Sequence, residues 1–271
     1  MGPRAGALTP AGDQPVNHGP LLLTGGTGRL GRELLTELPR LGVADLEAPG
    51  RSDLDITDAE NVGLYVTASR PRLVVHAAAY TNVAEAESRR AECWDANVAG
   101  TRHLVAAARE VGARFLFVST DYVFYGDRPG GGYREDDTPG PVRNYYSLTK
   151  LVAEESVRAA PGSLVLRTSF RPREWPYPQA FDDLFTSQDY VDVIAPLVAE
   201  VVQRYDRGQV PYGTLHVATE RKSVFDLARR RSPAVARASR ASAKVELPAD
   251  VSLNTDRWRA LRARWAAKVR G

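Results

Sequence analysis

The sequence predicts an α/β protein whose core is a doubly wound parallel sheet, followed by a small, reduced C-terminal cap. Three observations predict this fold. Short apolar runs typical of buried parallel strands alternate with segments of helical periodicity over the first two thirds of the chain. The first apolar run ends in a glycine-rich turn. The alternation stops after Arg171, so we expect a different architecture there.

Each element of the sheet follows from its local pattern. The run "LLLTGG", residues 21–26, indicates a buried strand that ends in a tight turn. Leucines recur at helical spacing over residues 29–42, and a proline and a glycine mark the end of that helix. The next strands are predicted at 44–49, 72–79, 114–120 and 163–169, with helices at 58–69, 100–112 and 145–160 between them.

The last third of the chain is more irregular. Residues 171–181 hold three prolines and three aromatics, which favour an ordered loop or a pocket wall over a helix. A helix at 190–205, a strand at 213–218 and a helix at 223–231 are predicted beyond it. The chain is therefore divided into a flexible extension at 1–19, a nucleotide-binding domain at 20–170 and a cap region with a returning strand and helices at 171–271.

Composition excludes several classes of protein. The 271 residues are 43% hydrophobic, enough for a real core, and the net charge is +3. From Glu220 onward there are fourteen basic and five acidic residues. Such a run suits nucleic acid or an acidic membrane, but it more often forms the solvated face of helices. No aromatic stacking platform accompanies it, so we expect no nucleic-acid partner.

The single cysteine, Cys93, excludes an intrachain disulfide and any multi-cysteine metal site. We expect no metal centre. No apolar run approaches the length of about 18 residues that spans a bilayer, and the N-terminus lacks the apolar core of a signal peptide. The sequence therefore predicts a cytoplasmic protein that does not bind membranes.

The segment "TGGTGRLG" places Gly25, Gly28 and Gly31 between the first strand and the first helix. Glycines allow a tight turn, a close approach of the backbone to a diphosphate, and close packing of the helix on the sheet. The helix N-terminus offers free N–H groups to the phosphates. This setting predicts a Rossmann-like dinucleotide site, in which Thr27, Arg29 and Leu30 belong to the binding turn.

Residues near the second strand select the cofactor. Arg51, in "APGRSDLD", lies where a cation would bind a 2′-phosphate, so NADP(H) is preferred and NAD(H) is the alternative; an exposed loop arginine is the competing interpretation. Asp55 and Ile56 fit an adenine pocket, with the carboxylate on the exocyclic amine and the isoleucine against the ring. The small residues Ala77, Ala78 and Ala79 would let the ribose and nicotinamide lie across the strand ends.

The segment "YYSLTK" contains a tyrosine and a lysine four residues apart. On a helix, Tyr146 and Lys150 share one face, whereas Tyr145 points about 100° away and is a bystander. The strand ending in "VST" would bring the hydroxyl of Ser119 or Thr120 to the carboxyl edge of the sheet. Tyrosine would protonate a carbonyl oxygen, the lysine ammonium would lower the tyrosine pKa, and Thr120 would bind the substrate oxygen.

The combined motifs resemble the dTDP-4-dehydrorhamnose reductase group of the extended short-chain dehydrogenase/reductases. They are "TGGTGRLG", "HAAAYTNVAEAE", "NVAGT", "STDYVF", "YYSLTK" and "LRTSF". The resemblance implies an NADPH-dependent ketoreductase acting on the 4-keto group of a nucleotide-activated deoxysugar, and it leaves a homodimer open. It implies Thr120, Tyr146 and Lys150 as the catalytic triad. The implied cofactor residues are Gly25, Gly28, Gly31, Asp55, Ile56, Ala77, Ala78, Ala79 and Lys150, and Tyr146 also faces the cofactor.

The substrate side departs from that group. Phe170 stands where the family usually has tryptophan, and the insertion after it is much shorter, which predicts a reduced substrate-binding cap. Phe170, Arg171 and Trp175 leave the strand beside Thr120, so they are predicted to border the substrate pocket, or else only to form a surface loop. The substrate residues are completed by Asp121, Tyr122 and Tyr146.

Two other functions stay open on the sequence. An epimerase or dehydratase of the same branch would recycle a tightly held NAD instead of consuming added cofactor. A regulatory subunit would keep the nucleotide site without turnover, as does the similar beta subunit of methionine adenosyltransferase. The presence of Thr120, Tyr146 and Lys150 favours the reductase.

Overall fold

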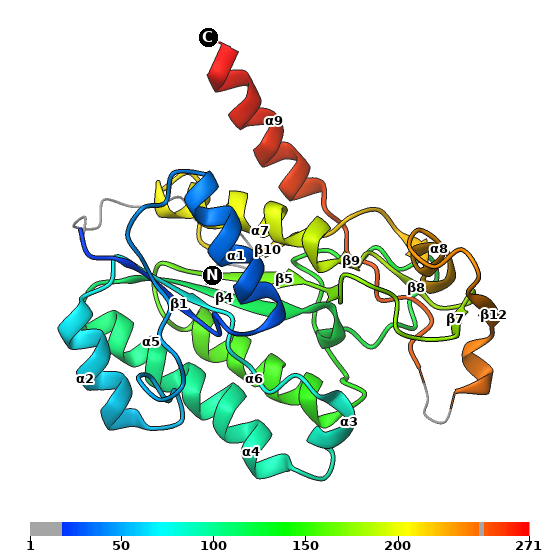
Figure 1. Ribbon diagram of the computed structural model, residues 1–271, viewed down its shortest axis with the longest axis horizontal. Coiled ribbons are helices and arrows are strands. Elements are labelled where there is room, and N and C mark those ends of the chain that lie inside the picture. The colour runs from blue at the N-terminus through cyan, green and yellow to red at the C-terminus, as the bar shows by residue number, and fades with distance from the viewer. Residues whose placement is uncertain (1–17, 244–246, 271) are drawn as a thin grey trace.

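The computed structural model describes residues 18–243 and 247–270, so most of the predicted extension at 1–19 lies outside the described residues. Six parallel strands form the central sheet in the order β10-β5-β4-β3-β1-β2 (Figure 1). The strands are β1 (Leu21–Thr24), β2 (Leu46–Glu47), β3 (Leu73–His76), β4 (Arg114–Thr120), β5 (Ser163–Thr168) and β10 (Gly213–His216). The predicted doubly wound α/β fold is confirmed.

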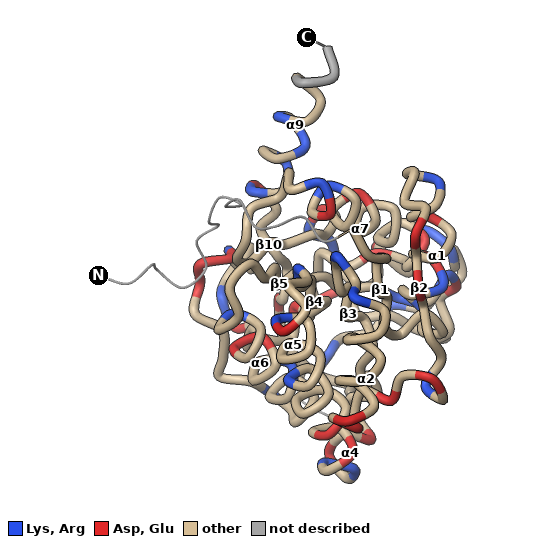
Figure 2. Tube along the Cα trace, turned by 90° about the vertical axis from the view of Figure 1, so that its left-hand side faces the viewer, with Lys and Arg blue, Asp and Glu red and all other residues tan. Residues whose placement is uncertain are grey.

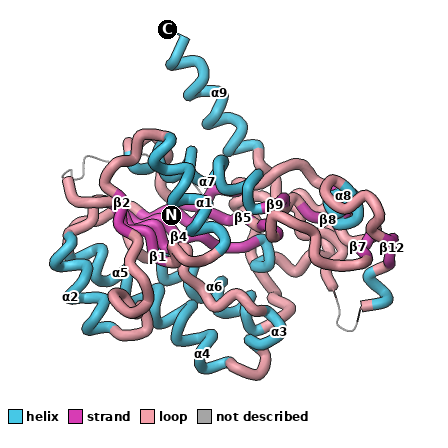
Figure 3. Tube along the Cα trace, viewed as in Figure 1, coloured by secondary structure: helices cyan, strands magenta, loops and turns pink. Residues whose placement is uncertain are grey.

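Helices cover both faces of the sheet (Figures 1 and 3). One face carries α1 (Arg29–Arg40) and α7 (Val191–Asp206), whose leucines, valines and isoleucine form a buried cluster over β1, β3 and β5. The other face carries α2 (Ala59–Ser69), α5 (Gly100–Glu110) and α6 (Tyr145–Arg158) over a second cluster. Burial on both faces explains why the central strands are continuous apolar runs in the sequence.

The strand order creates a switch point between β1 and β3. Helix α1 follows β1 on one face, and α5 precedes β4 on the opposite face. In open α/β sheets, ligands bind outside the carboxyl ends of the strands at such a point. The glycine turn that begins at Gly25 and the alanines that begin at Ala77 lie at this edge.

Residues 83–99 form a helical bridge that the sequence did not predict. It consists of α3 (Val83–Ala86), α4 (Arg90–Trp94) and a π-helix, Asp95–Ala99, which continues directly into α5. The amide of Asn97 in the π-helix donates to Thr149 at 2.9 Å and to the carbonyl of Tyr80 at 3.2 Å. The bridge therefore joins the loop after β3 to α6.

A small cap follows β5. It contains β6 (Phe170–Arg171), β7 (Gln179–Phe181), β8 (Phe185–Thr186), β9 (Asp189–Tyr190), β11 (Lys222–Ser223), α8 (Val224–Arg229), β12 (Ala236–Ala238) and a 3-10 turn at Arg240–Ser242. Three two-stranded sheets pair β6 with β9, β8 with β11 and β7 with β12. Residues after 171 contribute to the cap and, through α7 and β10, also to the main sheet and its core. The domain boundary at 170 therefore stays a prediction.

The last helix, α9 (Asp256–Arg270), was not predicted from the sequence. It projects away from the body, and Figure 2 shows basic residues along it. Trp258, Leu261 and Trp265 are buried against the α1 and α7 face, while Arg262 pairs with Glu200 at 3.1 Å. No helix within residues 18–243 and 247–270 is long and apolar enough to span a bilayer.

Candidate active site

The glycine turn is shaped by two close approaches. Gly25 has φ +78°, and a Cβ there would lie 2.6 Å from the nitrogen of Ala78. A Cβ on Gly31 would lie 2.1 Å from the carbonyl oxygen of Gly25. At Gly28, by contrast, the nearest heavy atom would be 3.1 Å away. Gly25 and Gly31 are therefore required by packing, while a Cβ on Gly28 would make a single tight contact with the carbonyl oxygen of Gly25.

The N-terminus of α1 fits a dinucleotide diphosphate. Gly28 is the N-cap residue, no side chain caps the helix, and its first turn has no acidic residue. Thr27 and Arg29 are exposed beside this end, whereas the side chain of Leu30 belongs to the main core, so only its backbone could face a ligand. Free N–H groups, a positive helix end and an exposed arginine favour an anion at this position.

His76 fixes the edge of β3 beside the turn. Its ring nitrogens lie 2.7 Å from the hydroxyl of Thr24 and 3.0 Å from that of Thr101. Burial, together with the nearby charge of Lys150, lowers the pKa of His76 to about 3, so the imidazole is neutral. The backbone nitrogen of Ala77 donates to the carbonyl of Thr24 at 3.2 Å. The alanine segment is thus held beside the glycine turn, and Ala78 and Ala79 are partly exposed there.

The residues predicted to bind the adenosine half contact one another. Arg51 Nε and Asp55 Oδ2 form an ion pair at 3.1 Å, and the Arg51 side chain is 81% exposed. Hydrogen bonds from Thr57 and the charge of Arg51 lower the pKa of Asp55 against a small opposing effect of burial. Ile56 packs on α5, where its carbonyl oxygen lies 3.0 Å from Nδ1 of His103. Arg51 is exposed enough to reach a phosphate. To bind one, its guanidinium would have to exchange the carboxylate of Asp55 for the phosphate.

A compact polar group lies at the end of β4 and the start of α6, and it consists of Thr120, Asp121 and Tyr146. Thr120 donates to Asp121 at 3.1 Å, and it also accepts from the backbone nitrogen of Tyr122 at 3.2 Å. The Tyr146 phenol lies close enough to the Thr120 hydroxyl for Thr120 to lower its pKa. The first turn of α6 is fixed by Asn144, whose side chain accepts from the backbone nitrogen of Ser147 at 2.8 Å.

The pKa of Tyr146 is shifted in the direction opposite to our expectation. The sequence suggested that the lysine ammonium lowers it, but burial raises it, and the charges of Asp121 and Tyr122 add to this rise. The hydrogen bond of Thr120 opposes the rise only partly. Tyr146 is therefore a protonated phenol at neutral pH, which is the form that can donate a proton.

Lys150 lies one helical turn beyond Tyr146 and is 3% exposed. Its ammonium donates to the carbonyl of Val118 at 2.8 Å and lies 3.9 Å from the ring centre of Phe117. Burial lowers the pKa of Lys150 to about 7, against the opposing charge of the buried carboxylate of Glu154. The lysine thus points at the end of β4, and it changes its charge near neutral pH.

Tyr145 lies outside this group. Its backbone nitrogen donates to Glu87 at 2.7 Å, and the guanidinium of Arg90 lies 5.0 Å from the centre of its ring. Both partners belong to the segment around α3 and α4 rather than to the carboxyl edge of the sheet. The two adjacent tyrosines therefore face different surroundings, as their helical spacing predicts.

The predicted substrate residues separate into two surroundings. Phe170 packs against the main core, while Trp175 packs against the cap cluster with the aromatic and aliphatic residues of α8. The guanidinium of Arg171 lies 5.7 Å from the centre of the Trp175 ring. Burial raises the pKa of Asp121 to about 6, although Thr120, Ser169 and Arg171 each lower it.

Several polar atoms at this edge are buried without a hydrogen-bond partner. They are Oδ2 of Asp121, Oγ1 of Thr168, Nε of Arg171 and Nε1 of Trp175. Buried polar atoms in proteins are nearly always paired. This group of donors and acceptors is thus suited to a polar ligand. Thr168 was missed by sequence reasoning, although its place at the end of β5, in register with Thr120, could have revealed it.

Tyr177 is a second residue that sequence reasoning missed. It is 53% exposed, and its ring stands edge-on to that of Trp175 with the centres 5.5 Å apart. The signal in the sequence was an aromatic residue between two prolines, Pro176 and Pro178. Proline on both sides restricts the backbone that carries this exposed ring.

Residues 19–171 match the model of the RmlD substrate binding domain family. The chain belongs to this family. The predicted resemblance to dTDP-4-dehydrorhamnose reductases is confirmed, since the family match covers the sheet edge described above, from the glycine turn to Arg171.

Two curated family members illustrate the likeness. A dTDP-4-dehydrorhamnose reductase of Streptomyces griseus is 49% identical over 139 residues, which are 50% of this chain and 44% of that protein. One of Mycolicibacterium smegmatis is 34% identical over 230 residues, which are 79% of this chain and 69% of that protein. The matched region thus spans about half the length of several curated relatives.

A solved structure extends the likeness to the whole fold. The dTDP-4-dehydrorhamnose reductase of Bacillus anthracis, crystallised in complex with NADP, is 27% identical with a TM-score of 0.78. The match covers 91% of this chain and 93% of that one. A match of this extent includes residues of the cap as well as those of the sheet.

Proposed function

We propose that this protein is an NADPH-dependent ketoreductase that reduces the 4-keto group of dTDP-4-dehydrorhamnose or a closely related dTDP-activated deoxysugar. Family membership supports the reaction, and the NADP complex of the Bacillus anthracis reductase supports the cofactor. A nucleotide sugar is the substrate named by the related enzymes.

One observation carries the proposal. A protonated, partly buried Tyr146 lies beside Thr120 and Asp121, both of which affect its pKa, and Lys150 lies one turn further along the same helix. This group stands at the carboxyl edge of a sheet whose neighbouring turn has the shape and the free N–H groups for a diphosphate. A proton donor beside a dinucleotide site is the minimal equipment for carbonyl reduction.

The residues can be given roles in the reaction. NADPH, when bound, supplies the hydride; the turn at Gly28 would hold its diphosphate and Lys150 its ribose. Tyr146 gives its phenolic proton to the carbonyl oxygen while the carbon is reduced. Thr120 donates a hydrogen bond to the same oxygen once it releases Asp121. A charged Lys150 would stabilise the phenolate that remains.

The test is consumption of cofactor. Purified protein is incubated with NADPH and dTDP-4-dehydrorhamnose, absorbance at the NADPH band is followed, and the product is identified by mass spectrometry. One NADPH should be consumed for each dTDP-deoxysugar whose mass rises by two hydrogens. Turnover of the sugar without net NADPH consumption would point to the epimerase or dehydratase chemistry. Binding without turnover would point to the regulatory subunit.

We also propose a homodimer and a cytoplasmic location. The cytoplasmic location is supported by the single, buried Cys93, which suits a reducing compartment. Light scattering after gel filtration tests the dimer, because a mass near that of one 29.6 kDa chain would contradict it.

A further inference from the structure

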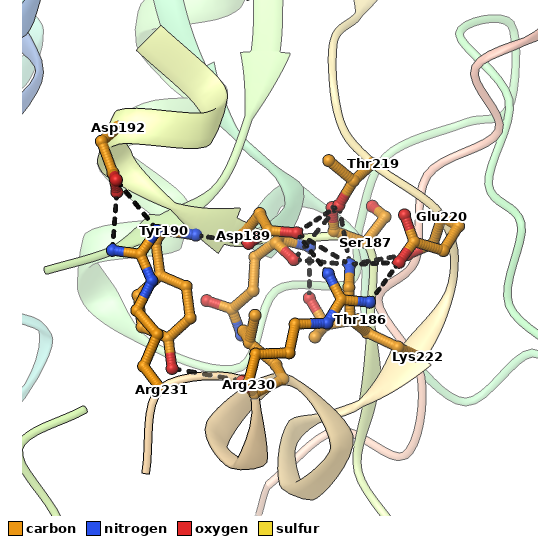
Figure 4. Close-up of polar contacts among 12 residues, drawn as sticks. Thr186, Ser187, Asp189, Tyr190, Asp192, Thr219, Glu220, Lys222, Arg230 and Arg231 are labelled. Atoms are coloured by element: carbon orange, nitrogen blue, oxygen red, sulfur yellow. Dashed lines mark hydrogen bonds and ion pairs between the residues drawn. The ribbon is translucent and has the colours of Figure 1, made fainter. Parts of the chain in front are cut away.

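The cations around the cap differ in whether they have an acidic partner. Arg173 binds Glu33 of α1 through two hydrogen bonds of 2.8 Å. Arg231 binds Asp192 through two of 2.9 Å, and Figure 4 shows this pair. Each guanidinium is therefore already occupied by a carboxylate, and its geometry is explained by the fold.

Arg171 has no such partner. No carboxylate in the described part of the chain lies within 4.0 Å of its guanidinium, and its buried Nε has no acceptor. Its backbone is fixed because β6 pairs with β9, with Arg171 opposite Tyr190. A guanidinium that is partly buried, rigidly based and unpaired is costly unless a ligand supplies the acceptor.

Tyr177 lies on the same side of the site. Burial raises the pKa of the Tyr122 phenol, Arg171 lowers it, and Asp121 and Tyr177 add to the rise, so all three side chains lie near that hydroxyl. The centre of the Trp175 ring lies 5.7 Å from the Arg171 guanidinium and 5.5 Å from the centre of the Tyr177 ring. An exposed aromatic alone would mean little, but this one continues a row of site residues.

We propose that Arg171 binds the diphosphate of the substrate and that Tyr177 stacks on its base. The inference rests on the proposed function for the class of substrate. The keto group belongs beside Tyr146 and Thr120, so the nucleotide must extend away from them across the carboxyl edge. Arg171 interacts with Asp121 and Tyr122, which themselves border Tyr146. Tyr177 is linked to Arg171 through the ring of Trp175. A planar guanidinium matches the paired oxygens of a diphosphate, and an exposed aromatic face matches a planar base.

The two roles can be separated with two ligands. The probes are dTDP and thymidine, titrated by calorimetry into the full chain with saturating NADPH. Arg171→Gln should weaken dTDP about 10-fold to 100-fold and leave thymidine unchanged, because thymidine has no phosphate. Tyr177→Leu should weaken both ligands by a similar factor of about 5 to 100, because both carry the base.

Arg173→Gln is the matched control, since it removes the same charge from the same loop but from a guanidinium bound to Glu33. Its affinity for dTDP should stay within about twofold of the wild-type value. Arg171→Lys keeps the charge and loses the fork, so it should fall between wild type and Arg171→Gln. Melting temperatures identify any variant that is unfolded, and Arg171→Lys then takes the place of Arg171→Gln.

The outcomes separate the two proposals. If wild type binds dTDP in the predicted pattern but reduces no dTDP-ketosugar, the inference stands and the proposed function fails. If wild type reduces the ketosugar while Arg171→Gln binds dTDP as wild type does, the inference is wrong. It is also wrong if Arg173→Gln loses as much affinity as Arg171→Gln, or if wild type binds no dTDP.

Discussion

Two polar groups of this protein adjoin the paired strands β6 and β9 and differ in whether their hydrogen bonds are filled within the chain. The Lys222 cluster, made of Asp189, Thr219, Glu220, Lys222 and Arg230, satisfies its own hydrogen bonds (Figure 4). The Asp121 edge, made of Asp121, Thr168, Arg171 and Trp175, leaves one buried polar atom of each residue unpaired. Both groups are costly to bury, but only the first repays that cost within the chain.

The Lys222 cluster shows what a structural network contains. The Lys222 ammonium donates to Gln188, Thr219 and Glu220 at 2.7 to 2.9 Å, and its carboxylate neighbour Asp189 also binds Arg230 at 2.9 Å. Every proton of the ammonium has an acceptor. Burial lowers the pKa of Lys222, although the charges of Asp189 and Glu220 oppose this change. The network therefore stabilises a buried ammonium and leaves no unfilled hydrogen bond of that ammonium for a ligand.

The Asp121 edge has the opposite character. Asp121 lies beside Thr120 and affects the pKa of Tyr146, and two of the unpaired atoms come from a loop that contains prolines. Unpaired polar atoms lower stability, and they are retained where a ligand completes them. The comparison teaches that charge and burial alone do not distinguish a site from a structural tie. What marks the Asp121 edge is that four unpaired atoms belong to one group, whereas Ser69 and Arg204 each have a single unpaired atom elsewhere in the fold.

The largest effect is expected at the proton donor. Tyr146→Phe removes one hydroxyl and keeps the ring, so the rate of ketone reduction should fall about 10² to 10⁴-fold while NADPH affinity is kept. Steady-state kinetics and fluorescence titration of NADPH measure the two quantities. Tyr145→Phe is the matched control, because its ring lies on Arg90, and its rate should stay near wild type. A folded Tyr146→Phe protein with wild-type turnover would refute the assignment.

The next effect is expected in the Lys222 cluster. Lys222→Met leaves Asp189 and three acceptors short of a donor, so the free energy of unfolding should fall by about 3 to 5 kcal/mol. Urea denaturation followed by circular dichroism measures this loss. The control is Arg237→Ala in the same cap, where an exposed pair with Asp182 should contribute less than about 1 kcal/mol. Equal losses for the two variants would remove the distinction between the clusters.

The Asp121 edge should respond with the opposite sign. Because burial raises the folded pKa of Asp121 from 3.8 to about 6, the folded protein binds this proton more tightly than the unfolded chain does. That stability is fully present below pH 3.8 and is lost as pH rises through about 6, a change of roughly 3 kcal/mol. Asp121→Asn should therefore be more stable than wild type at pH 8 and equal to it near pH 4, yet less active.

Urea unfolding of Asp121→Asn at both pH values checks this prediction. The neutral amide keeps the acceptor for the Thr120 hydroxyl, so the comparison isolates the charge. A variant that is less stable than wild type at pH 8 would show that the carboxylate is satisfied in the folded protein, and the contrast between the two clusters would fail.

Much of the fold could be predicted because its signals are periodic. The strands β1, β3, β4 and β5 contain apolar runs, and the helix from Arg29 carries leucines at helical spacing. Helix α9 escaped prediction because its three buried side chains, Trp258, Leu261 and Trp265, are separated by arginines. The short cap strands escaped because two or three residues carry no period.

The site was predictable where chemistry depends on spacing along one element. Tyr146 and Lys150 share a helix, and Gly25, Gly28 and Gly31 share a turn. The direction of the Tyr146 pKa was wrong because it depends on burial and on Asp121, which come from tertiary packing. Tyr177 could not be placed because its neighbours are set by a loop conformation.

The smallest effect on binding is expected for the choice between NADPH and NADH. It concerns Arg51, an exposed side chain, whereas the two polar groups compared above contain buried ones. NADPH should bind more tightly than NADH, and Arg51→Ala should narrow that gap by only about 1 kcal/mol, or roughly fivefold. The reason is that the Arg51 side chain is 81% exposed and already paired with Asp55 at 3.1 Å, so water and the carboxylate both compete with a 2′-phosphate. Titration of both cofactors at low and high salt measures the gap, which should shrink with salt in wild type and less in the variant.

Arg40→Ala, which removes an exposed arginine paired with Glu37 on α1, should change neither affinity. Equal dissociation constants for NADPH and NADH in the wild-type protein would contradict the preference itself, whereas an unchanged gap in Arg51→Ala would assign it to another residue.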